Sequence, residues 1–101
     1  ARAMLLDACV CLLYRQGGDS MSMQGLVDLL QNDISHNEDQ DMPSIKAAYD
    51  KIEADGATVE EDLGLKRYRM FQAIAYGETA ISVELDLYAK LSAMADRPLV
   101  G

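Results

Sequence analysis

The sequence predicts an all-α fold, a compact bundle of about five helices with no sheet. Apolar residues recur at helical spacing in five separate segments, and glycines or short polar stretches divide these segments. No stretch has the strict apolar–polar alternation of a half-buried strand, and the chain has no internal repeat. It has 101 residues, half of them hydrophobic, which suffices for one domain with a modest core. We therefore expect a single helical domain over residues 1–101.

The first two helices are expected at residues 1–16 and at about residues 23–32. The first has a wide apolar surface, which predicts a central position, and Gly17 and Gly18 end it. Ser22 is a suitable N-cap for the second. The residues that follow helical spacing are Met4, Leu5, Ala8, Cys11, Leu12 and Arg15 in the first helix, and Met23, Leu26, Val27 and Leu30 in the second.

A third helix is expected to start at residue 43 or 44 and to end before Gly56. Thr58 and Glu61 have the spacing of a capping box, in which a hydroxyl side chain and a carboxylate three residues later bond to the first turn. The fourth helix should therefore open there and run to about residue 75. The residues expected to face inward are Ile45, Ala48, Tyr49 and Ile52 in the third helix, and Leu63, Met70, Phe71 and Ile74 in the fourth.

Gly77 interrupts the helical pattern, and Thr79 can cap a fifth helix that runs to about residue 95. Arg97 and Pro98 end it, because the residue before a proline is disfavoured in helical conformation. The expected buried residues of this helix are Ile81, Leu85, Tyr88 and Leu91. Helices one, four and five have the widest apolar faces, so they should form the core of the bundle.

The charge of the chain argues against nucleic acid and anionic membrane surfaces as main partners. Nine basic residues stand against 17 acidic ones, for a net charge of −8, and nucleic-acid binding is driven mainly by neutralising phosphates. An acidic domain more naturally meets a basic partner, although solubility alone also explains the charge. No apolar run approaches the roughly 20 residues of a membrane span. There is no signal-peptide pattern, and the helical pattern begins at residue 1 without methionine, so we expect a segment of a longer protein.

Three patterns that could carry chemistry lack essential parts. Residues 77–79 resemble the end of a phosphate loop, but the upstream glycine is missing and a glutamate replaces the lysine. Asp39 and Asp41 have calcium-loop spacing without the required glycine and distal glutamate. Cys9 and Cys11 point to different faces of a helix and are expected to be structural thiols. We therefore expect no catalytic residue, no metal site and no cofactor.

Acidic residues form the first candidate binding surface. They lie in the polar loop at residues 32–42 and at the start of the fourth helix, both exposed kinds of position where binding residues concentrate. The candidate partner-binding residues are Glu38, Asp39, Asp41, Glu60, Glu61 and Asp62. The last three also suit the positive end of a helix dipole, which is the simpler interpretation of their position.

A short basic cluster is the alternative candidate, for nucleic acid. Lys66, Arg67 and Arg69 surround Tyr68, and basic side chains beside an aromatic ring can hold nucleic acid by charge and stacking. The alternative is a salt-bridged face in contact with solvent. Three positive charges in a chain of net charge −8 favour that second interpretation.

The order of these segments resembles the all-alpha domain of type IV secretion coupling proteins, the TraG/TraD-like hexameric ATPases of conjugation, above all the Gram-positive type. The segments that carry the likeness are residues 1–14, 23–30, 68–71, 75–79, 81–82, Leu91 and 96–99. The family often has a lysine where Glu78 stands here, and this difference weakens a nucleic-acid role for that turn.

The resemblance implies a cytoplasmic recognition domain within an ATPase that is anchored in the bacterial cell membrane and assembles as a homo-hexamer. Such domains are thought to receive a relaxase–DNA complex or a relaxosome accessory protein, without contacting the membrane themselves, and DNA is expected to bind weakly. The ATPase motifs of that family are absent from these residues, so the domain itself should not be an enzyme. Two alternatives stay open: a structural helical insert of another type IV secretion ATPase, and a helical DNA-binding domain.

Overall fold

The chain is all-α in the computed structural model, which describes residues 1–17, 22–35 and 45–96. These residues contain five helices and no strand, as predicted. The helices are α1 (Arg2–Gln16), α2 (Met23–Ser35), α3 (Ile45–Ala54), α4 (Leu63–Ile74) and α5 (Glu78–Asp96). The radius of gyration is 13.5 Å, close to the value of about 13 Å for a folded domain of this length.

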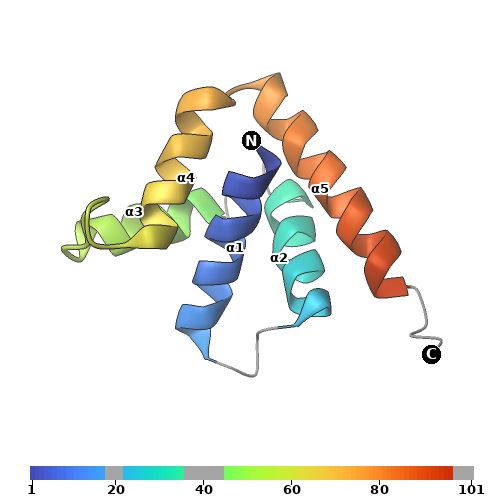
Figure 1. Cartoon of the computed structure of the whole chain (residues 1–101), viewed down its shortest axis with the longest axis horizontal. Helices are drawn as coiled ribbons and strands as arrows, with labels where there is room; N and C mark the ends of the chain where they lie inside the picture. The colour runs from blue at the N-terminus through green and yellow to red at the C-terminus, as the bar shows by residue number, and fades with distance from the viewer. Residues whose placement is uncertain (18–21, 36–44, 97–101) are drawn as a thin grey trace.

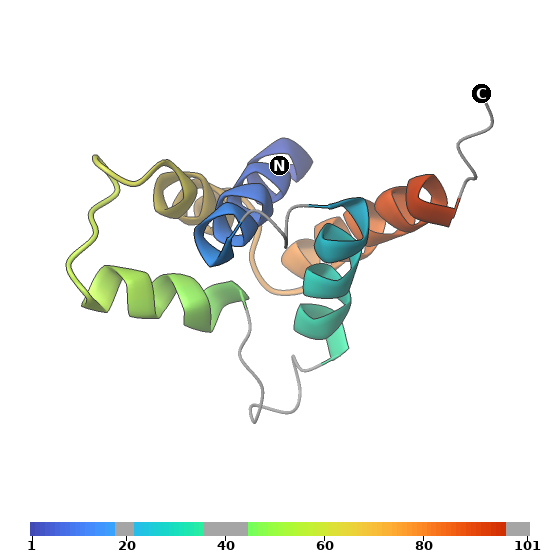
Figure 2. The ribbon, with the colours of Figure 1, turned by 90° about the horizontal axis from the view of Figure 1, so that it is seen from below.

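The helices form two packed pairs, α1 with α4 and α2 with α5, and α1 lies between the two pairs (Figures 1 and 2). α1 packs mainly on α4, and α5 packs mainly on α2, while α1 also contacts α2 and α5. α3 crosses beside the α1–α4 pair and contacts α4, as the view from below shows. The predicted core of helices one, four and five is therefore corrected. α1 is central, but α5 has α2 as its main neighbour.

Short-range signals set the ends of the first three helices. Gly17 has a φ of 119°, a conformation that favours glycine, and it follows the end of α1 directly. Ser22 caps α2 as predicted, because its Oγ accepts a hydrogen bond of 2.9 Å from the N–H of Gly25. α2 continues three residues beyond the predicted end, to Ser35. Gly56, with a φ of 113°, follows α3.

The predicted start of the fourth helix is wrong by four residues, because the N-cap is Asp62 and not Thr58. Thr58 and Glu61 bond to each other through their side chains at 3.4 Å. The N–H of Glu61 and that of Asp62 both reach the carbonyl of Thr58, at 3.2 and 2.9 Å, and close a separate turn. Asp62 is the true N-cap of α4, since its carboxylate accepts a hydrogen bond of 3.0 Å from the N–H of Leu65.

The inner face of α4 also differs from the prediction. Phe71 is buried as expected, but Leu63 is 57% exposed and Ile74 is 56% exposed. The buried residues of α4 are Gly64, Leu65, Tyr68 and Phe71, and Ala75 follows them at the end of the helix. Their spacing of three or four residues forms one stripe, which meets α1 at Gly64 and α3 at Tyr68. A helix with apolar residues on several sides does not reveal by periodicity alone which side packs.

The predicted inner face of α5 is confirmed at Leu91 and wrong at Ile81 and Leu85. Ile81 and Leu85 are 39% and 47% exposed, whereas Leu87 and Leu91 are buried and Tyr88 is half-buried. The helix begins at Glu78, so Thr79 lies inside its first turn instead of capping it. The packing of α5 on α2 determines which of its apolar residues are covered.

Tyr49 ties α3 to the α1–α4 pair. Its side chain is fully buried, and its hydroxyl donates a hydrogen bond to the backbone carbonyl of Ala8 in α1. Its ring stacks on that of Tyr68 with centroids 5.2 Å apart, and Tyr68 lies 6.1 Å from Phe71. These contacts place three aromatic rings from α3 and α4 in one cluster.

Candidate partner-binding surface

The acidic turn at residues 58–62 is the part of the predicted binding surface that the structure describes. Glu60 and Glu61 are exposed, and neither forms an ion pair with any described residue. Asp62 is different, because it caps α4 and pairs with Arg15 of α1, and its side chain is only 13% exposed. Asp62 therefore stabilises the fold, whereas the charges of Glu60 and Glu61 are not offset by a cation among the described residues, although Glu61 accepts a bond from the Thr58 hydroxyl.

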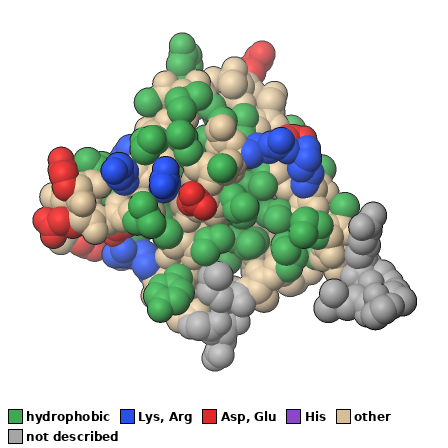
Figure 3. Space-filling model, viewed as in Figure 1, with side chains coloured by type: hydrophobic (Ala, Val, Ile, Leu, Met, Phe, Trp, Pro, Cys, Tyr) green, Lys and Arg blue, Asp and Glu red, His purple; other side chains and the backbone are tan. Residues whose placement is uncertain are grey.

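Further carboxylates lie near this turn along the chain. Glu53 and Asp55, at the end of α3, are also exposed. Figure 3 shows acidic side chains gathered at the end of the molecule that α3 and the segment after it form. The three predicted loop acids, Glu38, Asp39 and Asp41, lie outside the described residues. In the described part of this surface, Arg69 offsets the charge of Glu53, so Asp55, Glu60 and Glu61 are its exposed acids without an ion pair to a described residue.

The predicted basic cluster does not form a common surface for nucleic acid. Tyr68 is 7% exposed and stacks on Tyr49, so its ring cannot stack on a base. Arg69 bonds Asp50 and Glu53 of α3, each at 2.8 Å, and bonds from Lys46 and Arg69 hold the pKa of Asp50 below its usual range.

The two other basic residues of this cluster differ in their surroundings. The Nε atom of Arg67 lies 3.7 Å from the carboxylate of Asp7 in α1, but this buried N–H donates no hydrogen bond to any described residue. Lys66 is exposed and forms no ion pair with the described residues. The cluster therefore mainly ties α4 to α3 and α1, as the salt-bridge interpretation expects.

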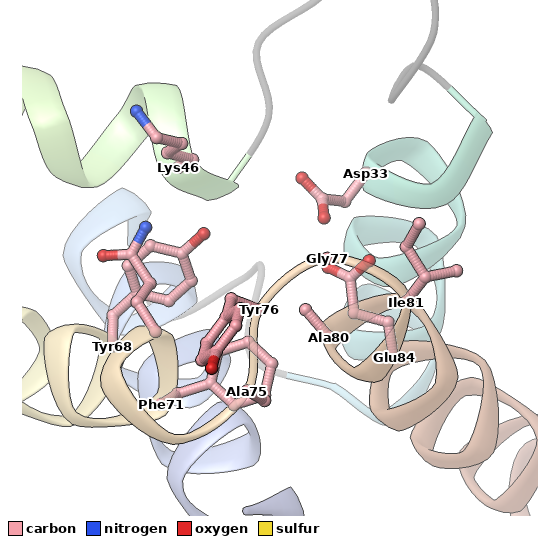
Figure 4. A pocket seen from close by; sticks show the side chains of 11 residues that line it. Asp33, Lys46, Tyr68, Phe71, Ala75, Tyr76, Gly77, Ala80, Ile81 and Glu84 are labelled. Atoms are coloured by element: carbon pink, nitrogen blue, oxygen red, sulfur yellow. The ribbon is translucent and has the colours of Figure 1, made fainter.

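A cleft of about 440 Å³ lies among α2, α3, α4 and α5 (Figure 4). Asp33 of α2 and Glu84 of α5 face each other at one side and are hydrogen-bonded through their carboxyl groups. Asp33 also accepts a bond of 2.8 Å from the N–H of Ile45, the first residue of α3. Lys46 lines the same cleft, but its ammonium group bonds Asp50 at 2.7 Å. The carboxyl pair thus joins three helices.

This carboxyl pair has unusual electrostatics. Burial raises the pKa of Glu84 to about 9, and the hydrogen bond to Asp33 and the charge of Asp33 add to the shift. Burial also raises the pKa of the Tyr68 hydroxyl, with smaller contributions from the charges of Asp33 and Glu84. At neutral pH the pair therefore holds a proton between its two carboxyl groups, which allows two acids to lie together.

The two thiols lie in surroundings that favour the protonated form. Cys9 is fully buried, Cys11 is partly buried, and both are free. Burial raises both pKa values above their usual range, and the charges of Asp33 and Glu84 add to the shift at Cys9. A protonated thiol is a poor nucleophile and a poor metal ligand. Over the described residues, no group of three or more histidine, cysteine, aspartate or glutamate side chains could hold a metal ion.

Comparisons with protein-family models, with curated proteins and with solved structures found no match to this chain. Among the described helices, none is long and apolar enough to cross a bilayer.

The structural role of two acidic residues was not predicted from the sequence. Asp33 and Glu84 are far apart along the chain and belong to no motif. Glu84 does carry a local signal, because it stands between Val83 and Leu85 in an apolar stretch of α5. A charged residue on a helix face that packs needs a partner, but the identity of that partner depends on how α5 packs on α2.

Proposed function

We propose that this chain is a protein-docking domain of the kind found in type IV secretion coupling proteins. Its partner is a relaxase or a relaxosome accessory protein with a basic surface. The domain binds but does no chemistry, and the ATP hydrolysis that the resemblance implies belongs to a larger, membrane-anchored hexameric parent protein.

The observation that carries this proposal is the pair of exposed carboxylates at Glu60 and Glu61. Neither is neutralised by a basic residue in the described part of the chain, in contrast to Asp62 beside them. Unpaired charges of one sign attract an oppositely charged partner, raise the rate of encounter and select among partners. The net charge of −8 adds to this field, and the sequence predicts Glu38, Asp39 and Asp41, outside the described residues, as further partner-binding acids.

The DNA-binding alternative has less support. Of the four residues proposed for it, Tyr68 is buried and Arg69 is bonded to two carboxylates. Lys66 and Arg67 alone would supply weak, salt-sensitive attraction to phosphates. A protein partner therefore remains the better proposal, with DNA as a weak secondary contact.

A binding titration tests the proposal. The chain is titrated with the relaxase and accessory proteins encoded in the same transfer region, and separately with duplex and single-stranded oligonucleotides, at low and physiological salt. We expect a protein to bind, and the double substitution Glu60→Gln and Glu61→Gln to slow association with little change in melting temperature. Glu78→Gln, at an exposed glutamate at the start of α5, is the matched control. Two results together would favour the DNA-binding alternative over the protein-docking proposal. They are tight DNA binding that is lost when Lys66, Arg67 and Arg69 are replaced, and protein binding that the acidic substitutions do not change.

The gene sequence around this segment gives an independent test. A coupling protein should carry a phosphate loop and an acidic strand motif on either side of it, with membrane spans toward the N-terminus. Flanking sequence of another kind would contradict the family assignment while leaving the acidic surface to be tested by itself.

A further inference from the structure

A groove of about 450 Å³ lies between the second half of α1 and the first turn of α4. Its lining residues are Val10, Cys11, Tyr14, Arg15, Glu61, Asp62, Leu63 and Gly64. The groove exists because α1 and α4 approach each other closely at Gly64, where a Cβ atom would lie only 2.7 Å from that of Cys11. Its volume falls in the range of roughly 300–1,000 Å³ of sites that hold small ligands or anchoring side chains.

The apolar walls of this groove are unusually open to solvent. Tyr14 is 75% exposed and Leu63 is 57% exposed. A single exposed apolar residue needs no explanation, but large apolar residues that gather on one concave surface are typical of binding sites. Both side chains line the same groove, although they come from different helices and lie far apart along the chain. An apolar side chain of a partner could be covered from both sides here.

The charges beside the groove are negative. Arg15 lines it, but its guanidinium group pairs with Asp62, so these two charges offset each other. Glu61 lines the groove and Glu60 precedes it in the acidic turn, and neither has a cationic partner among the described residues. An apolar floor with an unpaired negative rim fits a segment that combines apolar and basic side chains.

We propose that this groove is the anchoring site for an amphipathic, basic segment of the partner protein. One or two large apolar side chains of that segment lie between Tyr14 and Leu63, and its lysine or arginine side chains face Glu60 and Glu61. The inference rests on the proposed docking function and deepens it, because it names the chemistry of the segment and the residues that hold it. The apolar contacts supply affinity, and the charges supply the encounter rate.

Two synthetic peptides test this proposal on the intact chain. The first is a short amphipathic helix of leucine and lysine, and the second has glutamate in place of every lysine. We expect only the lysine peptide to bind, with an affinity that falls as salt rises. The double substitution Tyr14→Ala and Leu63→Ala should weaken it about tenfold or more, as truncation of anchor residues does. Ile74→Ala, at an apolar residue of α4 with the same exposure, and Glu78→Gln are the controls.

Cys11 reports directly on occupancy of the groove. Cys11 is one of the lining residues of the groove and is partly buried. Burial and the carboxylates of Asp7 and Asp62 raise the pKa of its thiol, so alkylation by iodoacetamide is followed at alkaline pH. The bound lysine peptide should slow alkylation of Cys11. Cys9, which is fully buried, should react only when the protein unfolds and so controls for loss of structure.

The outcomes separate this inference from the broader proposal. The proposed groove site would be refuted if the control variants lost as much peptide affinity as the groove variant. It would also be refuted if a saturating concentration of the lysine peptide left the rate of Cys11 alkylation unchanged. A relaxase or accessory protein that binds the Tyr14→Ala, Leu63→Ala variant as tightly as the wild type would also overturn it, while the docking function would stand. A lysine peptide held in the groove, with no transfer protein bound at all, would support the groove and refute the proposed family role.

Discussion

The hydroxyl of Tyr49 occupies the space that a side chain at Gly64 would need. A Cβ atom added to Gly64 would lie 2.5 Å from the Tyr49 oxygen and 2.7 Å from the Cβ of Cys11. The same hydroxyl donates its hydrogen bond to Ala8 of α1. Three helices therefore meet at one point, and the absence of a side chain at residue 64 makes that meeting possible.

Gly64→Ala should destabilise the protein. Alanine normally favours a helix over glycine by up to about 1 kcal/mol, but here the methyl group meets a backbone-proximal carbon and a buried hydroxyl. Overpacking of this kind costs about 1–3 kcal/mol, so we expect a net loss of stability in urea unfolding. A variant as stable as the wild type would show that α1 and α4 can separate at no cost.

Tyr49→Phe tests the hydrogen bond without emptying the core. The ring stays in contact with Tyr68, and the Ala8 carbonyl keeps its place within α1. We expect a loss of about 0.5–1.5 kcal/mol, the usual net value of one hydrogen bond. Combined with Gly64→Ala, the change should cost less than the sum of the two, because removing the hydroxyl also relieves part of the clash. Strict additivity would argue against the contact.

Phe71→Ala and Ile74→Ala should differ sharply, although both residues were predicted to face the core. Phe71 is 4% exposed and packs beside Tyr68, whereas Ile74 is 56% exposed. Denaturant unfolding should show that Phe71→Ala lowers the free energy of unfolding by about 3–5 kcal/mol. Ile74→Ala should change it by no more than about 0.5 kcal/mol. A loss below about 1 kcal/mol at Phe71 would mean that its ring faces solvent.

Glu84→Gln should change how stability depends on pH. The pKa of Glu84 rises from 4.5 to about 9 on folding, so the protonated form is favoured in the folded state. The contribution of this pKa shift to the stability of the folded state is fully present below about pH 4.5 and is lost as pH rises toward 9. Glutamine can donate the bond to Asp33 at any pH, so the variant should become increasingly more stable than the wild type over this interval.

Urea unfolding at a series of pH values measures this effect. Glu78→Gln removes one carboxyl group from the same helix at an exposed position and serves as the matched control. The cleft also holds Lys46 and Tyr68, so Lys46→Gln checks that its ammonium group does not carry the pH dependence. Parallel curves for Glu84→Gln and the wild type would refute the shared proton.

Arg69→Gln should affect the fold more than it affects DNA. Its guanidinium group bonds Asp50 and Glu53, which are partly exposed, so the expected cost is at most about 1 kcal/mol. Duplex DNA should bind weakly at physiological salt, and this substitution should leave that weak binding nearly unchanged in fluorescence anisotropy. A large loss of DNA affinity would return Arg69 to the nucleic-acid interpretation.

Local chemistry explains the parts of this protein that were predictable from its sequence. The all-α fold, the end of α1 at Gly17 and the cap at Ser22 depend on residues within a few positions of each other. Helical periodicity and glycine conformation act over one or two turns, and both are visible in the printed sequence. The predicted burial of Tyr49 and Phe71 is also confirmed, although the same periodicity did not separate Phe71 from the exposed Ile74.

The tertiary structure alone decided which apolar side of α4 and α5 is covered and which polar residues meet. Leu63 and Leu85 have the same local character as Leu65 and Leu87, yet the first two are exposed because α1 and α2 lie on the other side. The bonds of Asp33 to Ile45 and Glu84, and of Tyr49 to Ala8, join residues that are distant along the chain. Helical periodicity describes one helix at a time, whereas these contacts require the relative positions of several helices.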